Sequence, residues 1–193
     1  MNEFEVILSG KASFSIEVPY RLYKSNEPEG QPLFVYLQES GLDLSKLEKK
    51  IQPLLALSGY HLIIQAPYPK ITDHGVEGYQ WIPEKQGEQG LTSSREYVSE
   101  FLQEVIDNIL PHIKASRLVL IGWEASINQL SYFCATRPHY INELILFNGT
   151  LNRIWMDENN PEKYKHLRVL GLTGKDAEIK EKVAETINLW IHR

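Results

Sequence analysis

Short apolar runs alternate with stretches of helical periodicity along most of the chain. The apolar runs are aliphatic and rich in β-branched residues, which is typical of strands covered on both faces of a parallel sheet. They span residues 33–37, 61–67, 117–121, 143–147 and 167–172. Between them, apolar residues recur at three- and four-residue spacing, which predicts an amphipathic helix after most of the strands. These helical patterns cover residues 44–55, 98–110, 125–134 and 177–190.

The first part of the chain departs from this alternation. Residues 4–8 and 14–22 each predict a strand, and residues 9–11 (Ser-Gly-Lys) suit a turn between them. An antiparallel start followed by repeated strand–helix units predicts an α/β protein with a mostly parallel sheet between two helical layers. With 193 residues, of which 42% are hydrophobic, the chain is predicted to form a single domain over residues 1–193.

Two stretches between the predicted strands lack this periodicity. Residues 67–90 are rich in Pro and Gly, and we expect them to cross the edge of the sheet without regular structure. Thr92 or Ser93 then offers a capping side chain for the helix that follows. Residues 152–165 predict a polar loop.

Composition and charge argue against several functions. The net charge is −5 and basic residues occur only in short groups such as Lys49 and Lys50, which disfavours nucleic-acid binding. The chain starts without a signal-peptide pattern and has no apolar run near about 18 residues, so we expect a cytoplasmic protein without a membrane segment. The single cysteine, Cys134, excludes an internal disulfide, and its helical position predicts a packed thiol.

One tight turn between a predicted strand and a predicted helix carries a recognisable motif. Its residues are Gly122, Trp123, Glu124, Ala125 and Ser126. The motif is similar to the Gly-x-Ser-x-Gly nucleophile elbow of α/β-hydrolases, whose central serine sits on a strained strand-to-helix turn. Glu124 stands where that serine would be. The motif therefore predicts the hydrolase fold, but its central residue lacks the hydroxyl that the serine mechanism needs.

From about Pro32 onward the chain resembles the phospholipase/carboxylesterase branch of the α/β-hydrolases, which includes acyl-protein thioesterase-like enzymes. The matching segments occur in the family's order. They are residues 33–41 (LFVYLQESG) for the strand and oxyanion loop, residues 66–67 and 78–81 for the next loop, residues 122–149 for the elbow, helix and following strand, and residues 172–176 (LTGKD) for the segment of the triad acid. The resemblance implies an α/β-hydrolase-like three-layer sandwich, truncated at its C-terminal end, with Asp176 at the triad-acid position.

The chain differs from this family at the positions of the catalytic and oxyanion-loop residues. Family members have His-Gly where this chain has Gln38 and Glu39, and serine where it has Glu124. Their catalytic histidine follows a further strand, whereas one amphipathic helix takes up the residues after Asp176. No histidine is therefore assigned to the triad, and His192 at the end of that helix is interpreted as a surface residue.

A serine hydrolase needs a nucleophile, an imidazole base and preorganised donors for the oxyanion. The resemblance places Glu124 and Asp176 at catalytic positions, and it places Gln38, Glu39, Trp123 and Ala125 at the oxyanion loop. A carboxylate at position 39 would oppose the developing negative charge unless it points away. Ser126 lies two residues into the helix, so we expect it to pack there and not to replace the nucleophile.

Other uses of Glu124 remain open from the sequence. As a covalent nucleophile it would lack a base to activate water. Glu39 and Glu124 would lie at the same edge of the sheet, where converging carboxylates share a proton or bind a metal, with His74 as a nearby imidazole. No metal-spacing motif is present, so neither a metal nor a cofactor is predicted. A carboxylate held by the amides of the helix N-terminus is the simpler interpretation.

Aromatic residues occur in the segments expected to border the cleft. Tyr68, Tyr79, Trp81 and Trp155 are predicted to line it, and in the family such loops form an acyl-binding groove. The resulting hypothesis is a catalytically degenerate hydrolase-like protein that binds a small acyl or apolar ligand or a protein partner. The alternatives are a carboxylesterase or thioesterase with an unusual catalytic set centred on Glu124, and a homo-oligomer formed through an exposed sheet edge.

Overall fold

The computed structural model describes residues 17–25, 29–83, 88–157, 159–174 and 181–192. The strands are β1 (Tyr20–Lys24), β2 (Leu33–Leu37), β3 (Tyr60–Ile64), β4 (Tyr68–Thr72), β5 (Gly75–Gln80), β6 (Leu118–Trp123), β7 (Glu143–Phe147) and β8 (Arg168–Leu172). The α-helices are α1 (Leu44–Ile51), α2 (Glu88–Ile109), α3 (Ala125–Thr136) and α4 (Glu181–Ile191). Short 3₁₀ helices are η1 (Gln52–Ala56), η2 (Leu110–His112), η3 (Arg153–Trp155) and η4 (Pro161–Tyr164).

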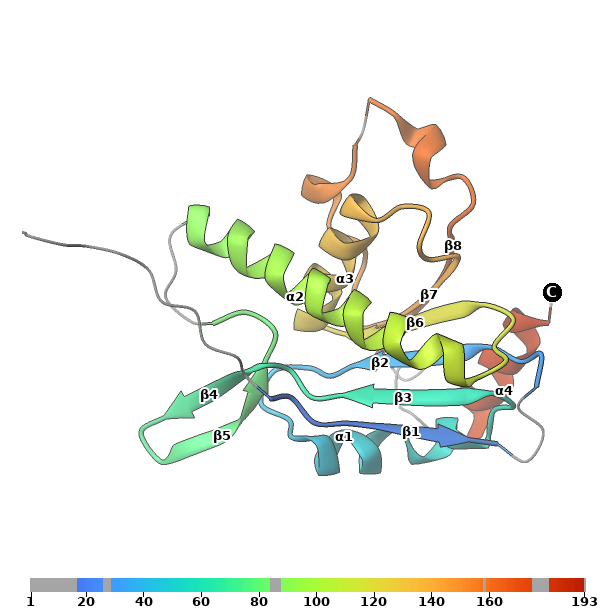
Figure 1. Ribbon diagram of the computed structural model, residues 1–193, viewed down its shortest axis with the longest axis horizontal. Coiled ribbons are helices and arrows are strands. Elements are labelled where there is room, and N and C mark those ends of the chain that lie inside the picture. Colours follow the sequence, from blue (N-terminus) through green and yellow to red (C-terminus); the bar gives the residue numbers. More distant parts are fainter. Residues whose placement is uncertain (1–16, 26–28, 84–87, 158, 175–180, 193) are drawn as a thin grey trace, which may run out of the picture.

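A six-stranded sheet in the order β1-β3-β2-β6-β7-β8 forms the centre of the molecule (Figure 1). Strand β1 is antiparallel to β3, and the other neighbouring strands of this sheet are parallel. Helices α2 and α3 cover one face, whereas α1, η1 and α4 cover the other. This arrangement confirms the predicted mostly parallel sheet with an antiparallel start between two helical layers.

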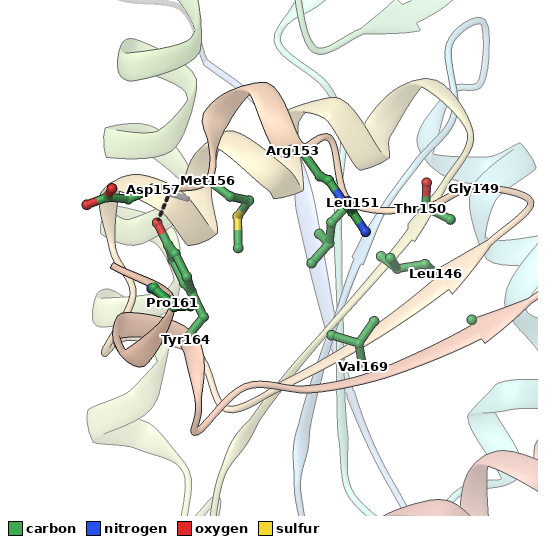
Figure 2. A pocket seen from close by; sticks show the side chains of 11 residues that line it. Leu146, Gly149, Thr150, Leu151, Arg153, Met156, Asp157, Pro161, Tyr164 and Val169 are labelled. Atoms are coloured by element: carbon green, nitrogen blue, oxygen red, sulfur yellow. Dashed lines mark hydrogen bonds between the residues drawn. The ribbon is translucent and has the colours of Figure 1, made fainter. Parts of the chain in front are cut away.

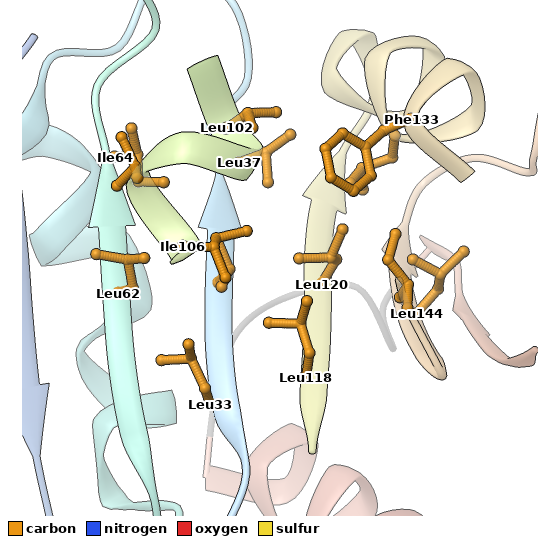
Figure 3. Close-up of a cluster of buried hydrophobic side chains, with 14 of the residues drawn as sticks. Leu33, Leu37, Leu62, Ile64, Leu102, Ile106, Leu118, Leu120, Phe133 and Leu144 are labelled. Carbon is orange, nitrogen blue, oxygen red and sulfur yellow. The ribbon is translucent and has the colours of Figure 1, made fainter. Parts of the chain in front are cut away.

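Alternation along the strands divides the core between the two faces. On the face covered by α2 and α3, leucines from neighbouring strands pack together, as Leu33, Leu62 and Leu120 do (Figure 3). Helix α3 adds Phe133 and Cys134 to the same cluster. Burial raises the pKa of the Cys134 thiol to about 12, so this cysteine is a packed thiol and not a reactive one.

The opposite face carries a row of stacked rings that crosses the strands. Phe34, His61, Tyr36, Trp123 and Phe147 stack in this order, with neighbouring ring centroids between 5.0 and 6.3 Å apart. All five side chains are buried. The indole of Trp123, the second residue of the elbow motif and one predicted at the oxyanion loop, therefore packs in this core layer.

His61 takes part in this row as a neutral imidazole. Its Nε2 lies 3.0 Å from the carbonyl oxygen of Leu57, which can only accept, so Nε2 carries the proton. Its Nδ1 then accepts from the hydroxyl of Tyr36 at 2.8 Å. Burial lowers the pKa of His61 to about 4, which keeps the ring uncharged near neutrality.

The prediction that residues 67–90 lack regular structure is wrong for β4 and β5. These strands form an antiparallel hairpin that projects from one end of the sheet (Figure 1). Asp73 and His74 form its turn, and Gly75 follows with φ 105°. Most of the hairpin is exposed, so its main-chain hydrogen bonds form without the apolar alternation that reveals a half-buried strand.

Several predicted boundaries also need correction. The strand expected over residues 14–22 is observed over Tyr20–Lys24, while residues 4–8 and 14–16 lie outside the described residues. Helix α2 begins at Glu88, so Thr92 and Ser93 lie inside it and do not cap it. The polar loop of residues 152–165 contains η3 and η4. Within the part of the chain described, no helix combines the length and the apolar character needed to cross a membrane.

Candidate functional site

Glu124 lies at the turn between β6 and α3, where the elbow motif predicts it. Its φ of 43° and ψ of −109° belong to a region that non-glycine residues rarely adopt. The backbone N–H of Glu124 donates to the carbonyl of Phe147 at 3.1 Å, and its own carbonyl accepts from the N–H of Ile127 at 3.1 Å. The turn is fixed on both sides while the Glu124 side chain remains exposed.

Small residues allow the close packing of strand and helix at this turn. A Cβ added to Gly122 would lie 2.4 Å from a methyl carbon of Leu130 in α3. A Cβ added to Gly149, beyond the end of β7, would lie 2.5 Å from a methyl carbon of Ile127. Glycine at these two positions therefore permits α3 to approach the sheet as the elbow requires.

Ser126 is fully buried behind the elbow. Its hydroxyl accepts from the N–H of Trp123 at 2.8 Å and lies within donating distance of the carbonyls of Trp123 and Leu37, at 2.9 and 3.1 Å. The hydroxyl is thus occupied by the backbones of β2 and β6. This contact agrees with the packing role expected for Ser126.

The carboxylate of Glu124 is not held by the helix, and that expectation is wrong. Its side chain accepts no hydrogen bond from the first turn of α3. A capping side chain needs extended backbone to reach the N–H groups of the first turn, whereas the positive φ of Glu124 directs its side chain elsewhere. Among the described residues, no group of three or more His, Cys, Asp and Glu side chains is arranged to hold a metal ion.

Gln38, at the start of the predicted oxyanion loop, is fully buried. Its Nε2 donates to the carbonyls of Leu42 and Tyr79, at 2.7 and 3.1 Å. The indole Nε1 of Trp81 donates to the carbonyl of Gln38 at 2.7 Å. The Gln38 side chain therefore ties the loop after β2 to the hairpin and takes up the space beneath it.

Main-chain contacts reinforce the same junction. The N–H of Gly41 donates to the carbonyl of Tyr79, and the N–H of Tyr79 donates to the carbonyl of Leu42, each at 2.9 Å. Gly41 has φ 88°, and a Cβ added to Gly78 would lie 2.2 Å from the Gly41 carbonyl oxygen. The oxyanion-loop position is consequently held tightly against β5.

Glu39 is turned toward α1. Its Oε1 lies 2.8 Å from the Nζ of Lys50, which also lies 5.2 Å from the ring centroid of Trp123. The counter-charge of Glu39 is thus a lysine on the α1 face of the sheet. Ala125 is the first residue of α3, directly after Glu124.

The aromatic residues predicted to line a cleft lie in two places. Trp81 is buried at the base of the hairpin, and Tyr68 and Tyr79 pack half-buried against the same core. Trp155, on η3, packs edge-on against Tyr132 of α3 with ring centroids 5.1 Å apart. Trp155 also lies under the guanidinium of Arg95 in α2, with the Arg95 Cζ 5.5 Å from its ring centroid.

The triad positions beyond the elbow are described only in part. Asp176 lies outside the described residues. His192 is exposed after α4, where its N–H donates to the carbonyl of Asn188 at 3.2 Å. His61 pairs in register with Phe34 and, through it, with Val119, which lies five residues before Glu124; His61 is therefore offset from Glu124 by roughly 16 Å along the strand direction and by two strands across the sheet. His61 is therefore not positioned as a base for Glu124.

A pocket that the sequence did not reveal lies over β7 and β8 (Figure 2). Its volume is about 600 Å³. The residues that line it include Leu146, Leu151, Arg153, Met156, Tyr164 and Val169. Three of these residues, Arg153, Met156 and Tyr164, belong to the stretch predicted as a polar loop, whose few apolar residues were the only sign of a pocket there.

Sequence comparison identifies no related protein, because neither a protein-family model nor a curated protein matches the chain. Solved structures do resemble it. The carboxylesterase from Mesorhizobium loti has a TM-score of 0.63 at 15% identity, covering 91% of this chain and 94% of its own. Esterase PE8 has a TM-score of 0.61 at 12% identity, covering 92% and 99%. Zea mays acyl-protein thioesterase 2 has a TM-score of 0.61 at 10% identity, covering 90% and 97%. At these identities the likeness concerns the fold, and the chain has the α/β-hydrolase fold.

Proposed function

We propose that this chain is a catalytically silent protein with the α/β-hydrolase fold that binds a ligand and does not hydrolyse an ester. The observation that carries the proposal is the presence of Glu124 at the nucleophile position of an elbow whose backbone is intact. The fold alone assigns no activity, so the side chains at the site decide the question.

The chemistry of the elbow supports a loss of hydrolysis. The serine mechanism needs an alcohol and a base, but Glu124 has no hydroxyl and the Ser126 hydroxyl is occupied by backbone groups. His61 is neutral, buried and remote from the elbow. A carboxylate nucleophile would form an acyl intermediate that needs a positioned base for its hydrolysis.

The oxyanion-loop position points the same way. The buried Gln38 side chain and the hairpin hold this loop through internal hydrogen bonds. Glu39 adds a carboxylate beside the loop and is held by Lys50. A loop held by internal hydrogen bonds can recognise a bound ligand. Unlike ester hydrolysis, ligand binding does not require a negative charge to develop at this loop.

The second candidate is a carboxylesterase-type or thioesterase-type hydrolase that uses Glu124. The strained backbone of Glu124 favours it, because strain at a tight turn is one way in which active sites present a nucleophile. The solved structures with the same fold include proteins described as a carboxylesterase and as an acyl-protein thioesterase.

Ester hydrolysis separates the two candidates. We expect purified protein to hydrolyse short p-nitrophenyl esters and thioesters no faster than buffer, and to remain unlabelled by a fluorophosphonate. Glu124→Gln and Ser126→Ala are the matched variants. Turnover that disappears in Glu124→Gln would establish the hydrolase instead, and a fluorophosphonate adduct that disappears in Ser126→Ala would show that Ser126 is reactive.

Restoring the missing nucleophile provides a second test. We expect Glu124→Ser to remain inactive toward the same esters, because the buried His61 is remote from the elbow and Glu39 remains in the loop after β2. A rate clearly above that of the wild-type protein would mean that the rest of a working catalytic set is present.

A further inference from the structure

The pocket over β7 and β8 owes its existence to the path of the chain between these strands. The connection consists of loop and the short helices η3 and η4, which arch over the sheet (Figure 2). These elements leave the outer strand incompletely covered, and Val169 of β8 keeps 44% of its surface exposed. A sheet face that a longer crossover helix would bury is therefore open to a ligand.

The floor of the pocket is apolar and has space to fill. Leu146 from β7 and Val169 from β8 form it together with Gly171. A Cβ added to Gly171 would meet no other atom within 4 Å. The lack of a side chain at Gly171 thus contributes directly to the depth of the pocket.

The walls are also apolar and are held in place. Leu151 and Met156 project from the arching segment toward the floor, and the ring of Tyr164 closes the end near η4 (Figure 2). The N–H of Asp157 donates to the Tyr164 hydroxyl at 3.1 Å, which fixes the ring against the segment. A volume of about 600 Å³ lies in the range typical of small-molecule sites.

One cation borders this apolar space. Arg153 lines the pocket and is exposed, whereas the carboxylate of Asp157, whose residue also lines the pocket, points away from the other side chains drawn (Figure 2). Asp157 accepts from the N–H of Asn159 at 3.2 Å and forms no ion pair with Arg153. Among the described residues, Arg153 has no acidic partner, so its guanidinium offers paired donors that suit a carboxylate.

We propose that this pocket binds a medium-chain aliphatic monocarboxylate, with its chain on the apolar floor and its carboxylate on Arg153. The assignment rests on the proposed binding function and names its ligand class. Glu124 is not among the residues that line the pocket, although Leu146 of the floor pairs in register with Gly122 of the elbow, so binding there is not expected to require the Glu124 carboxylate.

Titration calorimetry with decanoate, below its micelle concentration, tests the proposal on the full chain. We expect saturable binding that weakens about fourfold for each methylene removed in going to octanoate and hexanoate, the change expected from burying one methylene group. Failure of decanoate to bind at millimolar concentration would overturn the proposal.

Variants of the floor and of the cation locate the site. A Cβ at position 171 meets no atom within 4 Å, so the larger side chain of Gly171→Leu should occupy pocket space and weaken decanoate binding at least about tenfold, whereas Gly171→Ala should retain most of the affinity; the melting temperature of each variant checks that the fold is unchanged. Arg153→Gln should weaken decanoate at least about tenfold while leaving decan-1-ol unaffected. Lys114→Gln removes an exposed charge at the amino end of β6 and should leave both affinities unchanged. Unchanged decanoate binding in Gly171→Leu, or equal losses for decanoate and decan-1-ol in Arg153→Gln, would contradict the assignment.

The elbow variant keeps the two proposals distinguishable. Glu124→Gln should bind decanoate like the wild-type protein, because the pocket does not use this residue. Ester turnover by wild-type protein would defeat the proposed function and leave decanoate binding intact. Loss of decanoate binding in Glu124→Gln would place the ligand at the elbow and overturn the pocket assignment alone.

Discussion

His61 makes the stability of this fold depend on pH below neutrality. Its pKa is lowered from the usual 6.5 to about 4, because burial in the row of stacked rings disfavours the imidazolium form. In the unfolded chain the ring takes up a proton first as the pH falls. The folded state therefore has its full stability above about pH 6.5, loses stability as the pH falls toward about 4, and loses no more from this residue below that.

The size of this effect follows from the difference between the two pKa values. One pKa unit corresponds to about 1.4 kcal/mol, so the shift of His61 corresponds to about 3 kcal/mol. A domain is typically stable by about 5–15 kcal/mol, so the loss would be a sizeable part of the total. The hydrogen bonds to Leu57 and Tyr36 are made by the neutral ring and support the same direction.

Urea unfolding of wild type and His61→Gln between about pH 4 and pH 8 measures this contribution. We expect the variant to be less stable near pH 7, because it loses ring packing, and the difference to shrink by about 3 kcal/mol on going to pH 4. Carboxylates that titrate in the same range are common to both proteins and cancel in the difference. His112→Gln, which removes an exposed imidazole, is the matched control. A wild-type-minus-variant difference that stays constant across this range would refute a neutral buried His61.

Three further substitutions, and Gly171→Ala as a control, test the packing of the elbow and of the loop after β2. Gly122→Ala should cost about 1–3 kcal/mol in chemical denaturation because its methyl group collides with α3, whereas Gly171→Ala, which enters open space, should be tolerated. Trp81→Phe should cost about 1–3 kcal/mol by leaving a buried carbonyl without its donor, and an unchanged melting temperature would argue against that hydrogen bond. Glu39→Gln should lower the free energy of unfolding by at most about 1 kcal/mol, because it removes a partly exposed ion pair with Lys50. A gain in stability at neutral pH would instead show that repulsion between Glu39 and other negative charges outweighs this ion pair.

The fold was predictable from the sequence wherever burial imposes a pattern. Strands β2, β3, β6 and β7 are buried along their whole length, so each appears as a largely apolar run, in which His61 of β3 and Glu143 of β7 are the buried polar residues. The hairpin of β4 and β5 was missed because its stability comes from main-chain pairing at an exposed position. Prediction therefore failed where the side chains face solvent, because the strand pairing there leaves no apolar pattern in the sequence.

The backbone of the candidate site was predictable, but the partners of its side chains were not. Gly122 and the small residues Ala125 and Ser126 predicted a strand-to-helix turn, and the turn is present at Glu124. Glu39 is paired with a lysine of α1, and Gln38 is bonded to a hairpin that had not been foreseen. The pocket beside Arg153 depends on how the chain travels from β7 to β8, which no local pattern specifies.

The strained backbone conformation of Glu124 has a structural cause that does not depend on catalysis. The backbone of Glu124 is held by Phe147 and Ile127, and the approach of α3 is set by the absence of a side chain at Gly122. None of these contacts involves the side chain at position 124. A strained φ of this kind costs about 1–3 kcal/mol and persists where the surrounding structure over-determines it. The packing of β6, β7 and α3 thus holds the backbone of this turn without a contact from the Glu124 side chain, so the geometry of the turn is not by itself evidence of catalysis.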